Sequence, residues 1–377
     1  MSTTEVRQPP ETAAAKPDGY LHGLDLLRVI ASCAVVFTHV LAWFAGDGEQ
    51  WWAGTWTKWV SVGTLHLHPW LSFVGVAFFL VVSGVVVTHV TNRETPGQFL
   101  RRRVTRLAPL LFAVTFIGWC LINFGLRVSR VWEGPLGVDK LLLGMVLGNT
   151  FAEPDVALLA VTWTLRVQIV FYVLVALSIP LLRRWAWVPP LVIAALSCLT
   201  LLIAPHNEFF GAHFTGFATY IPLLCLGQLI SLVHSGKVHP VAGVAIGSVH
   251  FLLLVWADKL GLTFQGDGVP RTALLAVLVV VLLMKAQDRV SRSALVKAWA
   301  KRTYAIYLVH VCAIYPVFDT LTPHLDENLV VLIGLAVAYL AAEALHRWVE
   351  MPADRAIRRW ERRRSTTGRA GRSRSAV

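Results

Sequence analysis

The sequence is poor in charged residues, which make up only 15% of its 377 positions, although soluble domains average about 25%. Hydrophobic residues reach 56%, and the mean hydropathy is +0.61. A water-soluble core of this length does not need so much apolar surface, so the bilayer is the expected solvent. The net charge of +12 could indicate nucleic acid. The arginines, however, lie between apolar runs rather than on a polar domain, and we expect no nucleic-acid partner.

Cysteine is also scarce, and its placement excludes two classes of site. Five cysteines lie inside apolar runs, and none forms a C-x-x-C pair: Cys33, Cys120, Cys198, Cys225 and Cys312. They are expected to be small buried hydrophobes, so neither a disulfide framework nor a zinc site is predicted. The sequence also lacks a P-loop, a G-x-G-x-x-G, an H-E-x-x-H and a G-x-S-x-G motif. We therefore expect no soluble catalytic domain, no bound metal and no tightly bound cofactor.

Long apolar runs are what the sequence has instead. About 20 apolar residues cross the hydrocarbon core as a helix, and backbone groups in lipid need internal partners. We therefore predict an all-α fold, a polytopic membrane helix bundle of about ten transmembrane helices. The spans lie near 24–44, 70–90, 104–126, 161–182, 188–204, 214–234, 240–257, 270–286, 303–320 and 328–348. The apolar segment 141–151 is too short to span, and is expected to be re-entrant or interfacial.

Lysine and arginine predict the orientation of these spans. With the N-terminus in the cytoplasm, the inside segments hold 24 basic residues and the outside loops hold 5, so both termini are predicted to be cytoplasmic. Residues 1–20 are expected to be a disordered cytoplasmic N-terminus. Residues 353–377 are expected to be a basic, disordered cytoplasmic tail, lying against anionic membrane lipids or solvated. The membrane domain then covers residues 21–352.

Ionisable residues interrupt the first span, where such groups are costly and usually functional. Asp25 and Arg28 are three residues apart and are expected to pair on one helix face. Arg28 and His39 are eleven residues apart, close to three full turns, so they share a face about 16 Å apart along the axis. The polar stripe formed by Asp25, Arg28 and His39 favours a cavity that these residues line. The alternative is a snorkelling Arg28 and a His39 that bonds a neighbouring helix.

A basic cluster begins the third span. Arg102, Arg103 and Arg106 lie at its predicted cytoplasmic mouth, and helical periodicity places Arg102 with Arg106 on one face, with Arg103 nearly so. Guanidinium groups match phosphate oxygens, so a substrate with several phosphates near the membrane surface would suit this cluster. The positive-inside rule alone is the alternative explanation.

Two later spans also begin with polar residues. The fourth span opens at its outer end with Trp163, Thr164, Arg166 and Gln168. A tryptophan in this position can be an interfacial anchor, whereas the arginine and the glutamine require partners. The ninth span carries a stripe at spacings of three, formed by Tyr304, Tyr307 and His310. A packed aromatic seam is the alternative to a functional stripe.

Six sequence blocks, in order, resemble the acyltransferase-3 family of integral-membrane acyltransferases, which includes bacterial O-acetyltransferases of surface sugars and acyltransferases of macrolide antibiotics. The blocks are LDLLRVIASCAVVFTH, FFLVVSG, RRRVTRLAP, WTLRVQIVFY, YAIYLVH and VEMP. The resemblance covers about residues 20–352, and Arg28 and His39 match the spacing in the family's first helix. One departure stands out, because the family's glutamate in the fourth block is Gln168 here. A glutamine cannot ionise or act as a general base.

The resemblance implies a multi-pass O-acyltransferase of the bacterial cytoplasmic membrane. It would move an acyl group, expected to be acetyl, from cytoplasmic acyl-CoA (acetyl-CoA) as co-substrate to a hydroxyl of a sugar-containing acceptor, in a cell-envelope glycan or a secondary metabolite. His39 would take the hydroxyl proton and Arg28 would orient the site. The donor-binding residues would be Arg102, Arg103 and Arg106, with Ser83 and Gly84. The acceptor-side or supporting residues would be Trp163, Gln168, Tyr307, His310 and Glu350.

Glycine at position 84 would let another backbone, or a thin acyl-pantetheine arm, come close.

Two other functions remain open from the residues. A secondary transporter or flippase is compatible with ten helices and polar stripes, although many transporters show a duplicated half that is not seen here. A non-catalytic scaffold is the other, and Gln168 keeps it open.

Overall fold

The computed structural model describes residues 21–46, 51–69, 71–91, 94–128, 134–151, 158–263, 268–286 and 288–361. The predicted disordered segment 1–20 lies outside these residues, as does 362–377 of the predicted tail. In chain order the helices are α1 (His22–Gly46), α2 (Trp52–Lys58), η1 (Trp59–Thr64), α3 (Leu71–Val90), α4 (Pro96–Asn123), α5 (Val138–Met145), η2 (Asn149–Phe151), α6 (Thr162–Arg184), α7 (Val188–Ile203), η3 (Ala204–His206), α8 (Glu208–His234), α9 (Pro240–Lys259), α10 (Val269–Leu283), α11 (Ala294–Leu321), α12 (Glu327–Leu345) and η4 (His346–Glu350).

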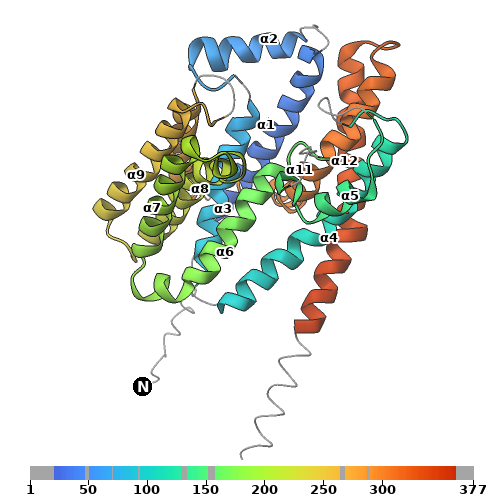
Figure 1. Cartoon of the computed structure of the whole chain (residues 1–377). Coiled ribbons are helices and arrows are strands. Elements are labelled where there is room, and N and C mark those ends of the chain that lie inside the picture. The colour runs from blue at the N-terminus through green and yellow to red at the C-terminus, as the bar shows by residue number, and fades with distance from the viewer. Residues whose placement is uncertain are drawn as a thin grey trace, which may run out of the picture.

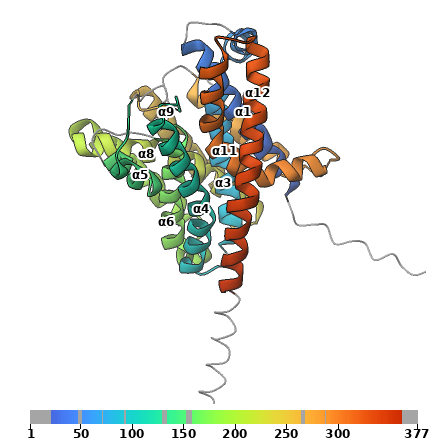
Figure 2. The same cartoon turned by 90° about the vertical axis from the view of Figure 1, so that its right-hand side faces the viewer.

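The predicted all-helical membrane bundle is confirmed (Figures 1 and 2). Within the described residues there is no strand, and nine helices are long and apolar enough to cross a membrane. The predicted span 270–286 forms α10, whose 15 residues cover about 22 Å, less than the roughly 30 Å of a hydrocarbon core. The short segment 141–151 forms parts of the eight-residue α5 and of η2.

The predicted tail boundary at residue 352 is wrong, because the last helix does not end there. The chain remains helical from η4 through Glu361. Glu361 accepts hydrogen bonds from Arg101 at 3.0 Å and from Arg102 at 3.2 Å, both on α4. The Arg101 guanidinium also lies 5.0 Å from the ring centroid of Trp360. These contacts with α4 hold residues 353–361 as an ordered helical end.

α3, α8 and α11 are the most buried of the long helices and form the centre of the bundle. A helix that is hydrophobic on every side is expected in the interior, and α3 has this character. Gly84 of α3 and Gly227 of α8 permit a close crossing. A Cβ at Gly84 would collide with the carbonyl oxygen of Leu224, and one at Gly227 with that of Val81. The crossing fixes the height of Ser83 in the bundle.

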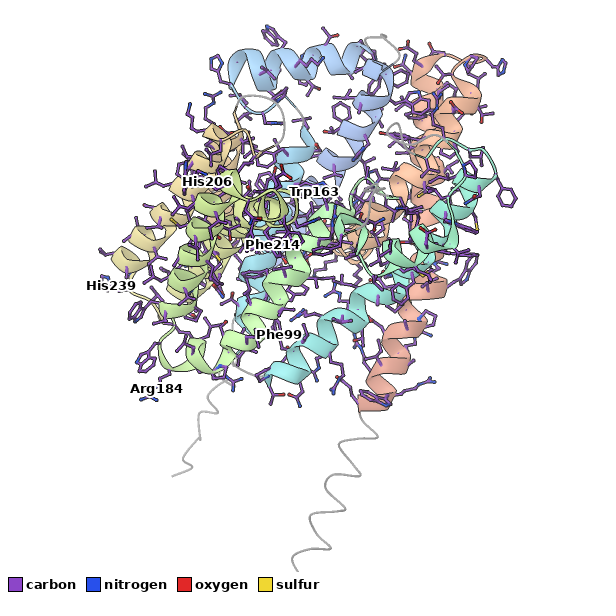
Figure 3. The ribbon with its side chains drawn as sticks, in the orientation of Figure 1. Phe99, Trp163, Arg184, His206, Phe214 and His239 are labelled. Carbon is purple, nitrogen blue, oxygen red and sulfur yellow. The ribbon has the colours of Figure 1, made fainter. Side chains whose placement is uncertain are left out.

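One end of the bundle, the lower end in Figure 1, gathers the start of α4 and the ends of α6 and the last helix. A capping box starts α4, in which Gln98 N donates to Thr95 Oγ1 at 3.4 Å and Thr95 N to Gln98 Oε1 at 3.2 Å. Arg183 of α6 donates to the carbonyl oxygens of Thr91 and Glu94 at 2.8 and 2.6 Å. α6 is therefore tied to the α3–α4 connection. Figure 3 shows Arg184 at this end and Trp163 near the middle of the molecule.

Candidate functional site

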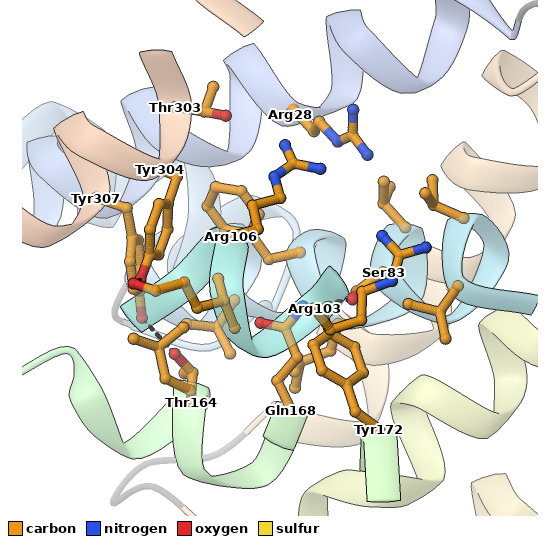
Figure 4. A pocket seen from close by; sticks show the side chains of 18 of the residues that line it. Arg28, Ser83, Arg103, Arg106, Thr164, Gln168, Tyr172, Thr303, Tyr304 and Tyr307 are labelled. Atoms are coloured by element: carbon orange, nitrogen blue, oxygen red, sulfur yellow. Dashed lines mark hydrogen bonds between the residues drawn. The ribbon is translucent and has the colours of Figure 1, made fainter. Parts of the chain in front are cut away.

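A cavity of about 140 Å³ lies where α1, α3, α4, α6 and α11 meet (Figure 4). Three guanidinium groups line it, from Arg28, Arg103 and Arg106. The remaining polar lining consists of hydroxyl groups and one amide, from Ser83, Thr164, Thr303, Gln168, Tyr172, Tyr304 and Tyr307. Among the residues that the structure describes, no carboxylate lines the cavity. The cavity therefore has the chemistry of an anion-binding site.

Arg103 and Arg106 give the cavity this character. Within the part of the chain that the structure describes, neither makes a hydrogen bond or an ion pair, and Arg103 instead lies over the ring of Phe99 at 5.4 Å. Arg28 does pair with Asp25 at 3.3 Å, which confirms the expected i,i+3 contact. A guanidinium that faces a cavity without a carboxylate is available to bind phosphate oxygens.

Arg102 does not share this arrangement. It donates to Glu94 at 2.8 Å and to Glu361 at 3.2 Å, and it is absent from the cavity lining. Helical periodicity predicts Arg102 and Arg106 on one face, with Arg103 nearly so, whereas the cavity receives only Arg103 and Arg106 of these three. The physical reason is that two carboxylates, one before α4 and one at the chain's last described residue, hold Arg102 on the other face.

Gln168 lies inside the cavity and joins α6 to α3. Its Nε2 donates to Ser83 Oγ at 2.5 Å and to Tyr172 Oη at 2.6 Å. Both amide hydrogens are thereby used, which a carboxylate at this position could not reproduce. Sequence reasoning missed Tyr172, although its i,i+4 spacing from Gln168 on one helix face was a usable signal. Gly84, the neighbour of Ser83, packs against α8 instead of lining the cavity.

The opposite end of the cavity is aromatic and apolar. Tyr307 contacts Thr164, with 2.5 Å between the two hydroxyl oxygens, and donates to Val161 O at 2.9 Å. Phe79 stands edge-on to Tyr307, with ring centroids 5.4 Å apart. Along α3 the lining extends from Val76 to Val87, about 16 Å at 1.5 Å per residue. Figure 4 shows Tyr307 and Thr164 at one side and Arg103 at the other.

His39 and His310 form a pair between α1 and α11, with ring centroids 4.9 Å apart. Neither lines the 140 Å³ cavity, and Tyr307 lies one turn before His310 with its ring centroid 6.3 Å away. His310 Nδ1 lies 3.0 Å from Ile306 O, so it carries the proton, and Nε2 holds the lone pair. This Nε2 is buried and has no partner within the described residues.

The imidazole of His39 lies beside the phenol of a tyrosine. His39 Nδ1 lies 3.3 Å from Tyr315 Oη, a contact that sequence reasoning missed. Two imidazoles and a phenol thus meet in the bundle interior, in line along α1 with the cavity that Arg28 lines. The stripe from Arg28 to His39 therefore leads from the cavity to a separate buried cluster, and does not line one cavity throughout.

The remaining predicted residues lie elsewhere. Trp163 packs on Tyr220 of α8, with ring centroids 4.9 Å apart. Glu350 is buried and lies 2.7 Å from His346 Nδ1. Neither lines the cavity. Among the residues that the structure describes, no three His, Cys, Asp or Glu side chains are grouped as metal ligands.

Comparison with known proteins identifies the family. The pattern of a family described as an acyltransferase domain matches residues 21–347. Nodulation protein 10 of Rhizobium leguminosarum bv. viciae is 24% identical over 331 residues, 79% of this chain and 84% of that protein. The exopolysaccharide production protein ExoZ of Rhizobium meliloti (strain 1021) is 27% identical over 328 residues, 81% of this chain and 96% of that protein.

Acyltransferase MdmB of Streptomyces mycarofaciens is 25% identical over 390 residues, 90% of this chain and 93% of that protein. No solved structure matches the chain. The match of the family pattern over most of the chain includes five of the six sequence blocks and ends just before VEMP, and these comparisons give the transporter and scaffold alternatives no support. The chain belongs to the acyltransferase-3 family, and it is a multi-pass membrane acyltransferase.

Proposed function

We propose that the chain is an O-acyltransferase of the bacterial cytoplasmic membrane that transfers an acyl group from acyl-CoA to a hydroxyl of a sugar-containing acceptor. The observation that carries the proposal is the cavity lined by Arg103 and Arg106, with Tyr304 and Tyr307 at one side of it (Figure 4). A molecule with phosphates at one end and a short acyl group at the other matches this polarity.

The donor would lie along α3. Its phosphates contact Arg103 and Arg106, and its thin pantetheine arm passes Ser83 and Gln168. The acyl thioester then reaches the end that Phe79 and Tyr307 close. We expect a short acyl group, such as acetyl, at this end. In this proposal Arg102 is a structural residue rather than a donor ligand.

The histidine pair would handle the proton of the acceptor. His39 with its proton on Nδ1, donated to Tyr315 Oη, keeps a lone pair on Nε2. That nitrogen takes the proton from the acceptor hydroxyl while the hydroxyl oxygen attacks the thioester carbonyl. The carbon–sulfur bond breaks, the thiolate of CoA leaves, and the imidazolium returns the proton to it. His310 holds a second lone pair beside His39, and Arg28 orients the donor near the same helix.

The proposed acceptor class rests on the weak acidity of a sugar hydroxyl and on the name of one relative. A sugar hydroxyl is a weak acid and needs a base of the kind that the histidine pair supplies. The relative ExoZ is described by its name as a protein of exopolysaccharide production. We therefore propose a cell-envelope or secreted glycan as acceptor.

A direct experiment uses the full chain in nanodiscs with radiolabelled acetyl-CoA and a panel of glycans. Label transferred to a glycan as an alkali-labile ester is expected for the parent chain. His39→Gln should abolish transfer and leave the CoA dissociation constant unchanged. Label that remains on CoA with every glycan, while the parent chain binds CoA, would refute the acceptor class. A parent chain that does not bind CoA at all would refute the donor.

A further inference from the structure

A second, larger cavity of about 610 Å³ lies between α8, α9 and α10. No residue lines both this cavity and the five-helix cavity. We name it the α8–α10 groove, after the lining segments 226–234 of α8, 240–251 of α9 and 274–285 at and beyond α10. α8 packs against α9, and Figure 1 shows α9 at the left of the bundle.

The groove is apolar along its length. Leu229, Val277 and Phe251 are typical of its walls, and α9 contributes two glycines four residues apart, Gly243 and Gly247. A Cβ at Gly247 would meet only side-chain atoms of Leu226 and Leu229, at 3.5 and 3.9 Å, which is ordinary contact. Gly247 therefore leaves room in this wall, whereas Gly243 packs closely against Val233 of α8, with whose Cγ2 an added Cβ would collide.

The groove faces the surroundings of the bundle. On α9 the side chains of Val241 and Val244 are exposed, and on α10 those of Val281 and Leu282 are exposed. Exposed aliphatic residues on membrane helices contact lipid chains, because no water reaches them there. α10 ends at Leu283 after only about 22 Å, and Lys285 follows two residues later. A cation is thus placed where the short helix ends.

Two basic side chains lie at this end of the groove. His234 ends α8, and both His234 and Lys285 are exposed and line the cavity. Within the residues that the structure describes, neither makes a hydrogen bond or an ion pair. The nearby carboxylate of Asp288 instead accepts a hydrogen bond from Ser291 N at 3.2 Å. Among the described residues the groove therefore has a long apolar part and, at Lys285, a cationic end without a carboxylate partner.

We propose that the α8–α10 groove binds an anionic phospholipid, with an acyl chain along the apolar walls and the phosphate at Lys285 and His234. The charge pattern favours this occupant over a second copy of the chain. A helix of a second copy would cover Lys285 without supplying an anion, and burying an unpaired charge is costly. A lipid phosphate supplies the anion and the hydrocarbon in one molecule.

The test is native mass spectrometry of the full chain in detergent with dioleoyl phosphatidylglycerol or dioleoyl phosphatidylcholine at equal concentration. A lysine near a membrane surface is worth about 1 kcal/mol toward anionic lipid, so the parent chain should retain phosphatidylglycerol about fivefold better. Lys285→Gln should remove this preference. Lys259→Gln, at the other end of α9, is the matched control and should keep it.

Gly247→Leu fills the groove and should lower retention of both lipids, whereas Gly216→Leu, at an exposed position of α8 with no atom within 4 Å of its Cβ, should not. Melting temperature and elution profile report folding, and if Gly247→Leu fails to fold, Lys285→Gln decides. Equal retention of the two lipids by the parent chain would overturn the proposal. So would an unchanged preference in Lys285→Gln, or a dimer that forms through this face and excludes phosphatidylglycerol. None of these readouts depends on acyl transfer.

Discussion

Neutralising Arg102, Arg103 and Arg106 one at a time should show which of them bind the donor and which serve only the orientation of the chain in the membrane. Arg103→Gln and Arg106→Gln each remove a cation that faces the cavity without a carboxylate partner. A hydrogen bond to a charged group is worth about 1.5–3 kcal/mol. We therefore expect the dissociation constant for CoA to rise roughly 10- to 150-fold in each variant. Added salt should weaken CoA binding to the parent chain, since the phosphate contacts are screened.

Arg102→Gln is the matched control, because it removes the same charge one residue away. Its side chain is 46% exposed, and its guanidinium already pairs with Glu94 and Glu361. Pairs of this kind contribute about 0–1 kcal/mol, so only a small fall in melting temperature is expected, with CoA affinity within about twofold of the parent. Equilibrium titration of CoA into the full chain in nanodiscs measures the affinity, and thermal unfolding measures the melting temperature. Equal loss of affinity in Arg102→Gln and Arg106→Gln would refute the division of the cluster that the structure indicates.

Three further predictions concern residues around the site. Gln168→Glu should raise the CoA dissociation constant about tenfold, because the new carboxylate pairs with the cavity arginines; unchanged CoA titrations would contradict this. His310→Gln should lower the transfer rate by about 10²- to 10⁴-fold without weakening CoA binding, and full activity would remove the second histidine from the reaction. Gly84→Ala should cost about 1–3 kcal/mol by overpacking against the α8 backbone, seen as a lower melting temperature, whereas Gly216→Ala should be nearly neutral; equal melting temperatures would mean that the crossing relaxes.

The positions of the helices could be predicted because hydropathy is a local property. A run of apolar side chains needs no knowledge of its neighbours to be placed in lipid, and nine of the predicted spans correspond to long described helices. The pair of Asp25 and Arg28 was predictable for the same reason, since one helix turn fixes it. α10 was overestimated because apolar composition does not reveal how early a helix stops.

The composition of the cavity was less predictable because it depends on contacts between distant segments. Arg102 differs from Arg103 because Glu94, shortly before α4, and Glu361, at the far end of the chain, both accept hydrogen bonds from it. The meeting of His39 with His310 likewise depends on the packing of α1 against α11. Gln168 was expected at the outer end of a span, yet it reaches Ser83. The hydrogen bonds from Arg183 to the carbonyl oxygens of Thr91 and Glu94 hold α6 at this position along the bundle. The sequence of α6 alone does not predict these contacts.

The contact between Glu361 and the start of α4 also has a consequence in time. Glu361 lies 259 residues after Arg102 and 260 after Arg101. At 5–20 residues per second, a ribosome needs roughly 10 to 50 s to add that stretch. During this interval Arg101 and Arg102 lack the carboxylate of Glu361, whereas Glu94, which precedes them in the chain, is already made. The selective arrangement of the three arginines is thus completed only when the end of the chain emerges. A chain that stops at residue 352 would lack the contacts of Glu361 with Arg101 and Arg102 at the start of α4.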